Sequence, residues 1–240
     1  MDSPFDLVAF AAHPDDIELT CGGTLARAAA EGKRVGMVDL TRGELGTRGT
    51  LDDRAREAEA ARQALGVAHR ENLGLPDAGI SVTDETRRVV VAAMRRLRPR
   101  AVILPYWKQR HPDHSAASRL VYDGAYLAGL IRYAPDLGAP FRPHTLAYAT
   151  AFHEVRPTFV VDISAHFEAK RLAVLAYHSQ FNPTLKPGEE LFPLVRDLID
   201  PLEAKHRHYG SLIGVTYGEP FVLKEVLRID DLTTLPVKSI

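Results

Sequence analysis

The chain has 240 residues, of which 45% are hydrophobic, and its 30 basic and 31 acidic side chains leave a formal net charge of −1. This composition is typical of a globular protein with a sizeable core. It lacks the clustered basic excess of a nucleic-acid-binding protein, the ~18-residue apolar run of a membrane span and the basic start of a secretory signal. The single cysteine, Cys21, excludes an internal disulfide, and we expect a cytoplasmic protein.

Strand-like and helix-like segments alternate along the chain, beginning with the buried-strand run FDLVAFAA at 5–12. Further strands are expected near 34–40, 69–73, 100–106, 145–152, 158–162 and 220–228. Helices are expected near 22–32, 51–65, 83–98, from the HPDH stretch to 130, and near 164–180 and 189–208. A capping-box pair, Thr50 and Asp53, marks the start of the second of these helices.

This alternation implies right-handed βαβ crossovers. We therefore expect an α/β fold, a single Rossmann-like doubly wound, mostly parallel sheet with flanking helices, and one domain over residues 1–240. In the common strand order 3-2-1-4, the first and fourth strands are neighbours, and ligands bind in the crevice at their carboxyl ends.

Two nearly identical turns follow those two strands. HPDD, from His13 to Asp16, comes after the first strand, and HPDH, from His111 to His114, comes after the fourth. His-Pro-Asp is also ordinary turn chemistry, because an aspartate caps a following helix. Two copies that converge on one crevice nevertheless favour a functional site.

The residue types of the two turns indicate a metal. Asp15, Asp16 and Asp113 would repel one another in a dry pocket unless a cation or an imidazolium lay among them. Histidine and carboxylate without thiolate suit Zn²⁺, with Fe²⁺ or Mn²⁺ as alternatives, held by three protein groups with one open position. The spacing alone does not decide between His111 and His114 as a ligand.

These motifs resemble the LmbE-like (PIG-L) N-acetylglucosaminyl deacetylases, a zinc-dependent family. The similarity extends through CGGTLA, DLTRGELGTRGT, LGLPDAGI, YHSQF and GVTYGEPF and is strongest to the bacillithiol-biosynthesis branch, whose substrate is N-acetylglucosaminyl malate. The resemblance implies one Zn²⁺ per chain, a small amino-sugar substrate and a homo-oligomer.

The resemblance also implies a role for each motif residue. His13, Asp16 and His114 correspond to metal ligands, and Asp15 corresponds to the general base. His111 would stabilise the oxyanion and act on the leaving amine, with Asp113 holding its ring. Arg54 matches an arginine that contacts substrate. An oxyanion tyrosine finds no match among Tyr177, Tyr209 and Tyr217, and His178 stands where the branch has an acid.

Other functions compete with this interpretation. A related deacetylase could act on a chitooligosaccharide or another glycoconjugate. A dinucleotide-binding module is suggested by Gly22, Gly23 and Asp39, but the acids of HPDD occupy the turn where a pyrophosphate would bind. A metal phosphoesterase would need a second metal set, which the sequence does not indicate.

Overall fold

A computed structural model describes residues 4–181, 198–235 and 237. The strands are β1 (Leu7–Ala11), β2 (Val35–Thr41), β3 (His69–Leu75), β4 (Ala101–Pro105), β5 (Thr145–Ala149), β6 (Phe159–Asp162) and β7 (Gly218–Val222). The helices are α1 (Asp16–Ala30), α2 (Leu51–Ala64), α3 (Asp84–Leu97), α4 (Pro112–Ala128), α5 (Phe167–Leu175), α6 (His178–Phe181) and α7 (Ile199–Ser211). No helix in these ranges is long and apolar enough to cross a membrane.

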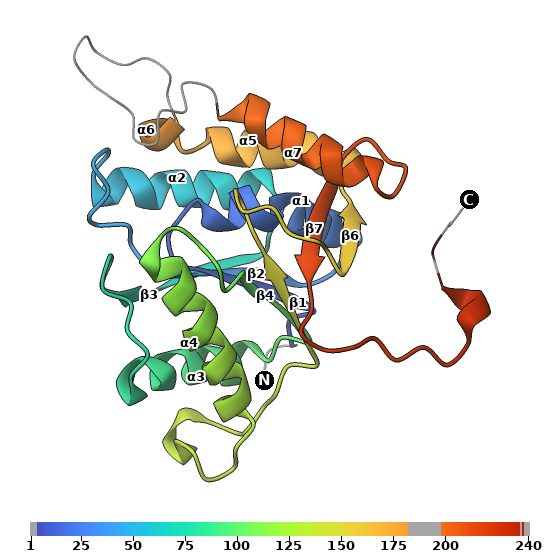
Figure 1. The fold of residues 1–240 in the computed structure, drawn as a ribbon. Coiled ribbons are helices and arrows are strands. Elements are labelled where there is room, and N and C mark those ends of the chain that lie inside the picture. The colour runs from blue at the N-terminus through green and yellow to red at the C-terminus, as the bar shows by residue number, and fades with distance from the viewer. Residues whose placement is uncertain (1–3, 182–197, 236, 238–240) are drawn as a thin grey trace.

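The seven strands form one sheet in the order β3-β2-β1-β4-β5-β7-β6. Strands β1 to β5 pair in parallel, and β7 runs antiparallel to both β5 and β6. The predicted doubly wound, mostly parallel α/β fold is therefore confirmed, and so is the adjacency of the first and fourth strands. The carboxyl ends of β1 and β4 open side by side at one edge of the sheet (Figure 1).

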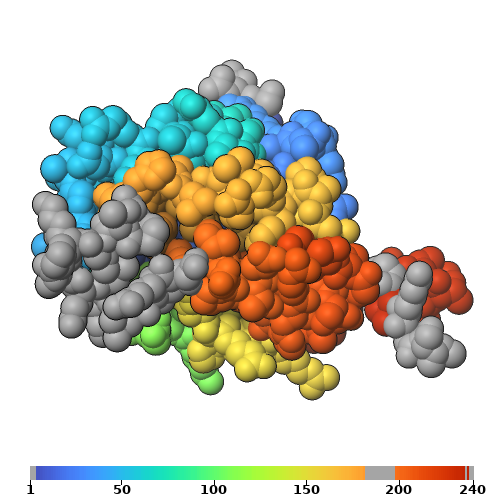
Figure 2. Space-filling model, turned by 90° about the horizontal axis from the view of Figure 1, so that it is seen from above, coloured from blue at the N-terminus to red at the C-terminus, as the bar shows by residue number. Residues whose placement is uncertain are grey.

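Helices cover both faces of the sheet because successive side chains of each buried strand point to opposite faces. Val8 and Phe10 of β1 pack with α3 and α4, whereas Ala9 and Ala11 pack with α1, α2 and α5. Figure 1 shows α3 and α4 on one side, and Figure 2 shows α2, α5 and α7 lying across the other. The small alanines let α1 pack closely against β1.

Helix α1 contains a kink at Cys21, where φ is −143°. The buried Glu219 carboxylate accepts hydrogen bonds from the backbone N–H groups of Gly23 (2.9 Å) and Thr24 (2.7 Å), and Lys170 Nζ donates to it at 2.6 Å. This ion pair satisfies the N–H groups that the kink exposes. A Cβ on Gly23 would lie 2.8 Å from Ile163, so the close packing of α1 requires glycine there.

Several predicted elements differ from the structure. The first helix starts at residue 16 rather than 22, because residues 16–20 already form a helical turn before the kink at Cys21. The predicted helix 164–180 is divided between α5 and α6, and part of the predicted helix 189–208 lies outside the described residues. The last strand ends at Val222, where its ladder with β5 ends.

Candidate active site

The two histidine–aspartate turns enter their helices in different ways. Helix α1 begins at Asp16, and its N-cap, Asp15, has the left-handed backbone φ of 108°. Helix α4 begins at Pro112, and its N-cap, His111, has an extended backbone and accepts the Asp113 N–H on Nδ1 at 3.2 Å. A left-handed aspartate is strained, and such strain is concentrated at functional sites.

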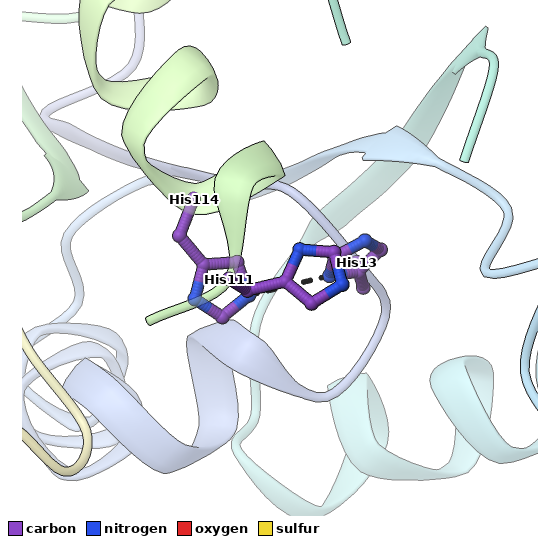
Figure 3. Close-up of side chains that lie close together, drawn as sticks. All are labelled: His13, His111 and His114. Atoms are coloured by element: carbon purple, nitrogen blue, oxygen red, sulfur yellow. Dashed lines mark hydrogen bonds between the residues drawn. The ribbon is translucent and has the colours of Figure 1, made fainter. Parts of the chain in front are cut away.

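Three donor atoms from the two turns converge at the edge between β1 and β4. His13 Nδ1 lies 3.3 Å from His114 Nε2 and 3.4 Å from Asp16 Oδ2, and Asp16 Oδ2 lies 3.2 Å from His114 Nε2. Figure 3 shows His13 arriving from the loop before α1 and His114 from the first turn of α4. We call these three residues the donor triad.

The triad has the dimensions of a metal site. A tetrahedral Zn²⁺ ion about 2.0–2.1 Å from its ligands separates neighbouring donor atoms by about 3.3–3.4 Å. The other nitrogen of the His13 ring, Nε2, faces carboxylate oxygens of Asp77 at 3.0 Å and Asp113 at 3.3 Å. These carboxylates favour the tautomer with the proton on Nε2, which leaves the Nδ1 lone pair directed into the triad.

The third histidine of the cluster, His111, is also close enough to take part in a metal site with His13 and His114. Its ring centroid lies 4.8 Å from that of His13 and 5.2 Å from that of His114 (Figure 3). However, its Nδ1 accepts a helix N–H, so the neutral ring carries its proton on Nε2. That nitrogen is then a hydrogen-bond donor rather than a metal ligand.

The expected contact between the Asp113 carboxylate and the His111 ring is wrong. Asp113 is buried, accepts backbone N–H groups from Ala78 at 2.7 Å and Ile80 at 3.3 Å, and faces His13. The reason is that Asp113 lies inside the first turn of α4, which turns its side chain away from the N-cap residue. Asp113 therefore supports the His13 ring instead.

Sequence reasoning missed Asp77. This residue lies in the turn after β3, where its Oδ1 contacts His13 and its Oδ2 accepts the Leu45 N–H at 2.9 Å. It stands in the quoted LGLPDAGI stretch, and an acid at the end of a further parallel strand was the available signal. The Asp77 carboxylate thus links the loop at 43–46 to His13 of the donor triad.

Beside the donor triad, Asp15 forms an ion pair with Arg54. Arg54 on α2 is 6% exposed and donates to the Pro14 carbonyl at 2.7 Å and to Asp15 Oδ2 at 3.3 Å. A Cβ on Gly43, whose φ is +69°, would lie 3.0 Å from the guanidinium, so glycine is needed for this close approach. Arg54 therefore fixes the strained turn through hydrogen bonds to both Pro14 and Asp15.

A cavity of about 320 Å³ lies over these groups, within the usual size range of small-molecule sites. Its wall includes His13, Asp15, Arg54, Asp77 and His111, together with the backbone of the loop at 43–46. We call it the catalytic cavity. It brings together four of the seven residues predicted for the site, and the other three, Asp16, Asp113 and His114, each contact His13.

The electrostatics of the cluster favour a cation. Burial disfavours the charged forms of both His13 and Asp16. The hydrogen bond to Asp16 and the charge of Asp16 nevertheless raise the pKa of His13 to about 9. In turn, His114 and His13 hold the pKa of Asp16 well below its ordinary value. Burial raises the pKa of Asp15 to about 7 against the attraction of Arg54. Burial and the neighbouring histidines lower the pKa of His111, which keeps its ring neutral.

None of the three tyrosines considered as an oxyanion group reaches the catalytic cavity in the described residues. Tyr177 is buried and donates to Glu18 at 3.0 Å, and Tyr209 hydrogen bonds to the backbone of Val155. Tyr217 contacts Glu203 at 2.9 Å on the surface.

Two further sequence features play other parts in the structure. Asp39 was the ribose-binding candidate of the dinucleotide alternative. It is buried and accepts hydrogen bonds from Nε and Nη2 of Arg70, at 2.7 and 2.9 Å. This buried ion pair removes the main support for a dinucleotide site. His178 is exposed on α6, and the following residue, Ser179, hydrogen bonds to Glu57 of α2.

Comparisons with known proteins agree with this geometry. A model of the PIG-L family, described as GlcNAc-PI de-N-acetylase, matches residues 8–125, the segment that carries both turns. The diacetylchitobiose deacetylase of Thermococcus kodakarensis is 30% identical over 218 residues, covering 86% of this chain and 78% of that protein.

Two further similarities extend over most of the chain. A 1D-myo-inositol 2-acetamido-2-deoxy-alpha-D-glucopyranoside deacetylase of Saccharopolyspora erythraea is 30% identical, covering 91% of this chain and 93% of that protein. The crystal structure of a conserved protein from Thermus thermophilus superposes with a TM-score of 0.84 at 44% identity, covering 94% of this chain and 98% of that one.

Proposed function

This chain belongs to the PIG-L family of deacetylases, and from that premise we propose that it hydrolyses the acetamide of an N-acetylglucosamine conjugate in a metal-dependent reaction. The observation that carries the proposal is the convergence of three metal-type donor atoms, a carboxylate and a neutral histidine around one cavity. Amide hydrolysis needs an electrophile, a base and a hydrogen-bond donor for the oxyanion. Each has a candidate here.

We assign His13, Asp16 and His114 as the ligands of one divalent ion, with Zn²⁺ preferred and Fe²⁺ or Mn²⁺ as alternatives. Two imidazoles and one carboxylate are a common ligand set for catalytic zinc. A divalent ion held there would supply Lewis-acid chemistry, polarising the acyl oxygen and making water more acidic. Asp77 and Asp113 orient the His13 ring from behind, as carboxylates commonly do for ligating histidines.

Asp15 serves as general base in this proposal. Its carboxylate borders the catalytic cavity, and its left-handed backbone turns it away from the triad occupied by Asp16. It takes a proton from the attacking water and then delivers that proton to the leaving amine. The elevated pKa suits a group that must both accept and release a proton near neutral pH.

His111 serves as the oxyanion donor. Because its Nδ1 accepts the Asp113 N–H, its Nε2 proton is available to the oxygen of the tetrahedral intermediate. The lowered pKa keeps this ring neutral, so we give proton delivery to Asp15 and the stabilising hydrogen bond to His111. Arg54 braces Asp15 and presents a cation to substrate.

As the preferred substrate of this class we propose N-acetylglucosaminyl malate, as in bacillithiol biosynthesis. A second cavity of about 260 Å³ adjoins the catalytic cavity, and Arg54 borders both. Arg42 also lines the second cavity and is exposed there. Two guanidinium groups next to the sugar site match the carboxylates of a malate group.

The test is acetate release from four substrates, each with and without a chelator. They are free N-acetylglucosamine, diacetylchitobiose, the inositol conjugate and N-acetylglucosaminyl malate. We expect chelator-sensitive release, fastest from the malate conjugate. Equal rates on all four would refute the malate assignment, and no release from any would refute deacetylation.

We also propose that the protein acts in the cytoplasm as a homo-oligomer. The segment after β7 projects from one edge of the molecule (Figure 2) and exposes apolar side chains, with Val226 96% and Leu232 79% exposed. Burial of such side chains against another copy would be favourable. Sedimentation equilibrium of the full chain distinguishes an oligomer from a monomer.

A further inference from the structure

The buried ion pair between Lys170 of α5 and Glu219 of β7 interrupts the hydrogen-bond ladder of α1. In an unbroken helix the N–H of residue 23 donates to the carbonyl of residue 19, four residues earlier. At the Cys21 kink the Gly23 N–H instead donates to Glu219 Oε1 at 2.9 Å. The Leu19 carbonyl accepts from Lys170 Nζ at 3.0 Å, and the same ammonium donates to Glu219 Oε1 at 2.6 Å. One ion pair therefore takes the place of one backbone hydrogen bond.

Stability does not explain this arrangement. Both charged side chains are 0% exposed, and the penalty for removing two charges from water makes a buried ion pair weak evidence for stability. In a straight helix the Gly23 N–H and the Leu19 carbonyl would satisfy each other without any buried charge. Such local departures from the simplest structure are expected where function requires a particular geometry.

The kink orients the short first segment of α1, residues 16–20. Asp16 is the first residue of this segment, and Asp15 is its N-cap. The Leu19 N–H donates to the Asp15 carbonyl at 3.1 Å, while the Leu19 carbonyl accepts from Lys170. A single helical turn therefore connects the ion pair to both aspartates.

We propose that Lys170 and Glu219 are positioning residues for the metal centre, because their ion pair sets the direction of the first segment of α1 and so the place of the Asp16 carboxylate. The inference rests on the proposed function, since it takes Asp16 as a metal ligand. Asp16 Oδ2 lies 3.2 Å from His114 Nε2 and 3.4 Å from His13 Nδ1. A rotation of the segment would change both distances and move this oxygen away from the dimensions of a tetrahedral site.

A second set of contacts limits the size of the expected effect. Glu18, within the same segment, is buried and accepts hydrogen bonds from Arg70 at 2.5 Å and from the Tyr177 hydroxyl at 3.0 Å. These bonds keep the segment near its place when the ion pair is lost. We therefore expect a displaced ligand and weaker metal binding rather than the loss of the site.

The experiment measures Zn²⁺ affinity, by competition with a chromophoric chelator, and the visible spectrum of the Co²⁺-loaded protein. Co²⁺ is used because its visible absorption depends on coordination geometry. In Glu219→Gln an amide with one acceptor oxygen replaces a carboxylate that accepts from Lys170 and from the N–H groups of Gly23 and Thr24. We expect Zn²⁺ affinity to fall by about 10–100-fold, as is usual when a group that supports a ligand is altered, and the Co²⁺ spectrum to change.

A double variant separates positioning from stability. Lys170→Met combined with Glu219→Met removes both charges and lets the Gly23 N–H return to the Leu19 carbonyl. Hydrophobic replacement of a buried ion pair is often neutral or stabilising, whereas removal of one partner is strongly destabilising. We expect the double variant to unfold at a higher temperature than Glu219→Gln and yet to retain the lowered Zn²⁺ affinity and the altered Co²⁺ spectrum.

Arg95→Met is the control for a loss of stability that does not involve α1. This buried arginine of α3 donates to the carbonyls of Ala128 at 3.1 Å and Leu130 at 3.0 Å, beyond the end of α4 that is remote from His114. It should lower the unfolding temperature and leave the Zn²⁺ affinity and the Co²⁺ spectrum unchanged.

The outcomes separate this inference from the proposed function. An unchanged Zn²⁺ affinity and Co²⁺ spectrum in Glu219→Gln would overturn the positioning role, and so would the recovery of both in the double variant. Either result leaves the metal centre intact. Failure of the unaltered protein to bind metal would overturn the proposed metal centre and the positioning role with it.

Discussion

The turns after β1 and β4 share the tripeptide His-Pro-Asp, yet their equivalent residues lie in different places. Both histidines border the catalytic cavity, but only His13 of the first turn belongs to the donor triad, whereas His111 of the second does not. Asp15 of the first turn faces that cavity, whereas Asp113 of the second is buried behind His13. Only the fourth residues, Asp16 and His114, lie in equivalent places, facing each other in the triad.

The point at which each helix begins explains the difference. Helix α1 starts at the fourth residue of its turn, and helix α4 starts at the second. Asp15 is therefore the left-handed residue just before α1, whereas Asp113 lies inside the first turn of α4, so the aspartates of the two copies point in different directions. Identical local sequences therefore acquire different chemistry through backbone geometry that neighbouring elements impose.

Replacing the two equivalent histidines should show the largest contrast. His13→Ala should lose the metal and lower kcat/KM by about 10³-fold or more, because the Lewis acid is lost. His111→Ala should keep its metal and lose about 10²–10³-fold in kcat, the usual cost of removing one oxyanion donor. Metal content after dialysis, measured with kcat/KM, checks both. Metal loss from His111→Ala would mean that the ligand assignment is wrong.

The two equivalent aspartates should differ almost as strongly. Asp15→Asn should lower kcat by about 10²–10⁴-fold with metal retained, since it removes the proposed general base. Asp113→Asn should weaken metal affinity by about 10–100-fold and lower stability by about 1–3 kcal/mol, because an amide cannot satisfy both buried N–H groups. Metal titration and denaturant unfolding measure these effects. Identical behaviour of the two variants would contradict the comparison.

The strained first turn should depend on its arginine brace. Arg54→Lys retains the charge but cannot contact both Pro14 and Asp15 with a planar fork, so we expect kcat to fall by about tenfold. Arg56→Lys on the same helix is the control, because its side chain is 75% exposed. Steady-state kinetics distinguishes a loss in kcat, from misplaced Asp15, from a rise in KM alone, which would indicate a substrate contact only.

The smallest expected effect concerns stability and pH in the metal-free protein. The folded pKa of Asp15, about 7, lies above its ordinary value of 3.8, so the folded state binds the proton more tightly. The Asp15 contribution to stability is therefore complete below about pH 4 and is lost as pH rises to about 7. As the pH is raised from 4.5 to 8, the free energy of unfolding of Asp15→Asn should increase by about 1–4 kcal/mol relative to that of the unaltered protein.

Denaturant unfolding in chelator at the two pH values measures that difference. Asp52→Asn, which removes an exposed carboxylate on α2, controls for the change in net charge. A stability difference for Asp15→Asn that stays constant with pH would show that burial does not raise this pKa.

Much of the fold and of the candidate site was predictable. Continuous apolar runs such as 5–12 and 100–106 indicated central parallel strands, and the strand order placed HPDD beside HPDH. Asp77 was not predicted, because acids are common in the turns after strands and only the folded chain shows that this one reaches His13. The contact of Asp113 was wrong for a related reason, since side-chain direction depends on where α4 begins.

By itself, the sequence determined the doubly wound sheet and the meeting of two histidine–aspartate turns, because hydrophobic periodicity and strand connectivity are local or topological properties. Only the tertiary structure decided which histidine belongs with Asp16 and which aspartate faces the cavity. These depend on backbone angles of single residues and on packing between distant elements. The left-handed Asp15, held by Arg54 from α2, is the clearest case.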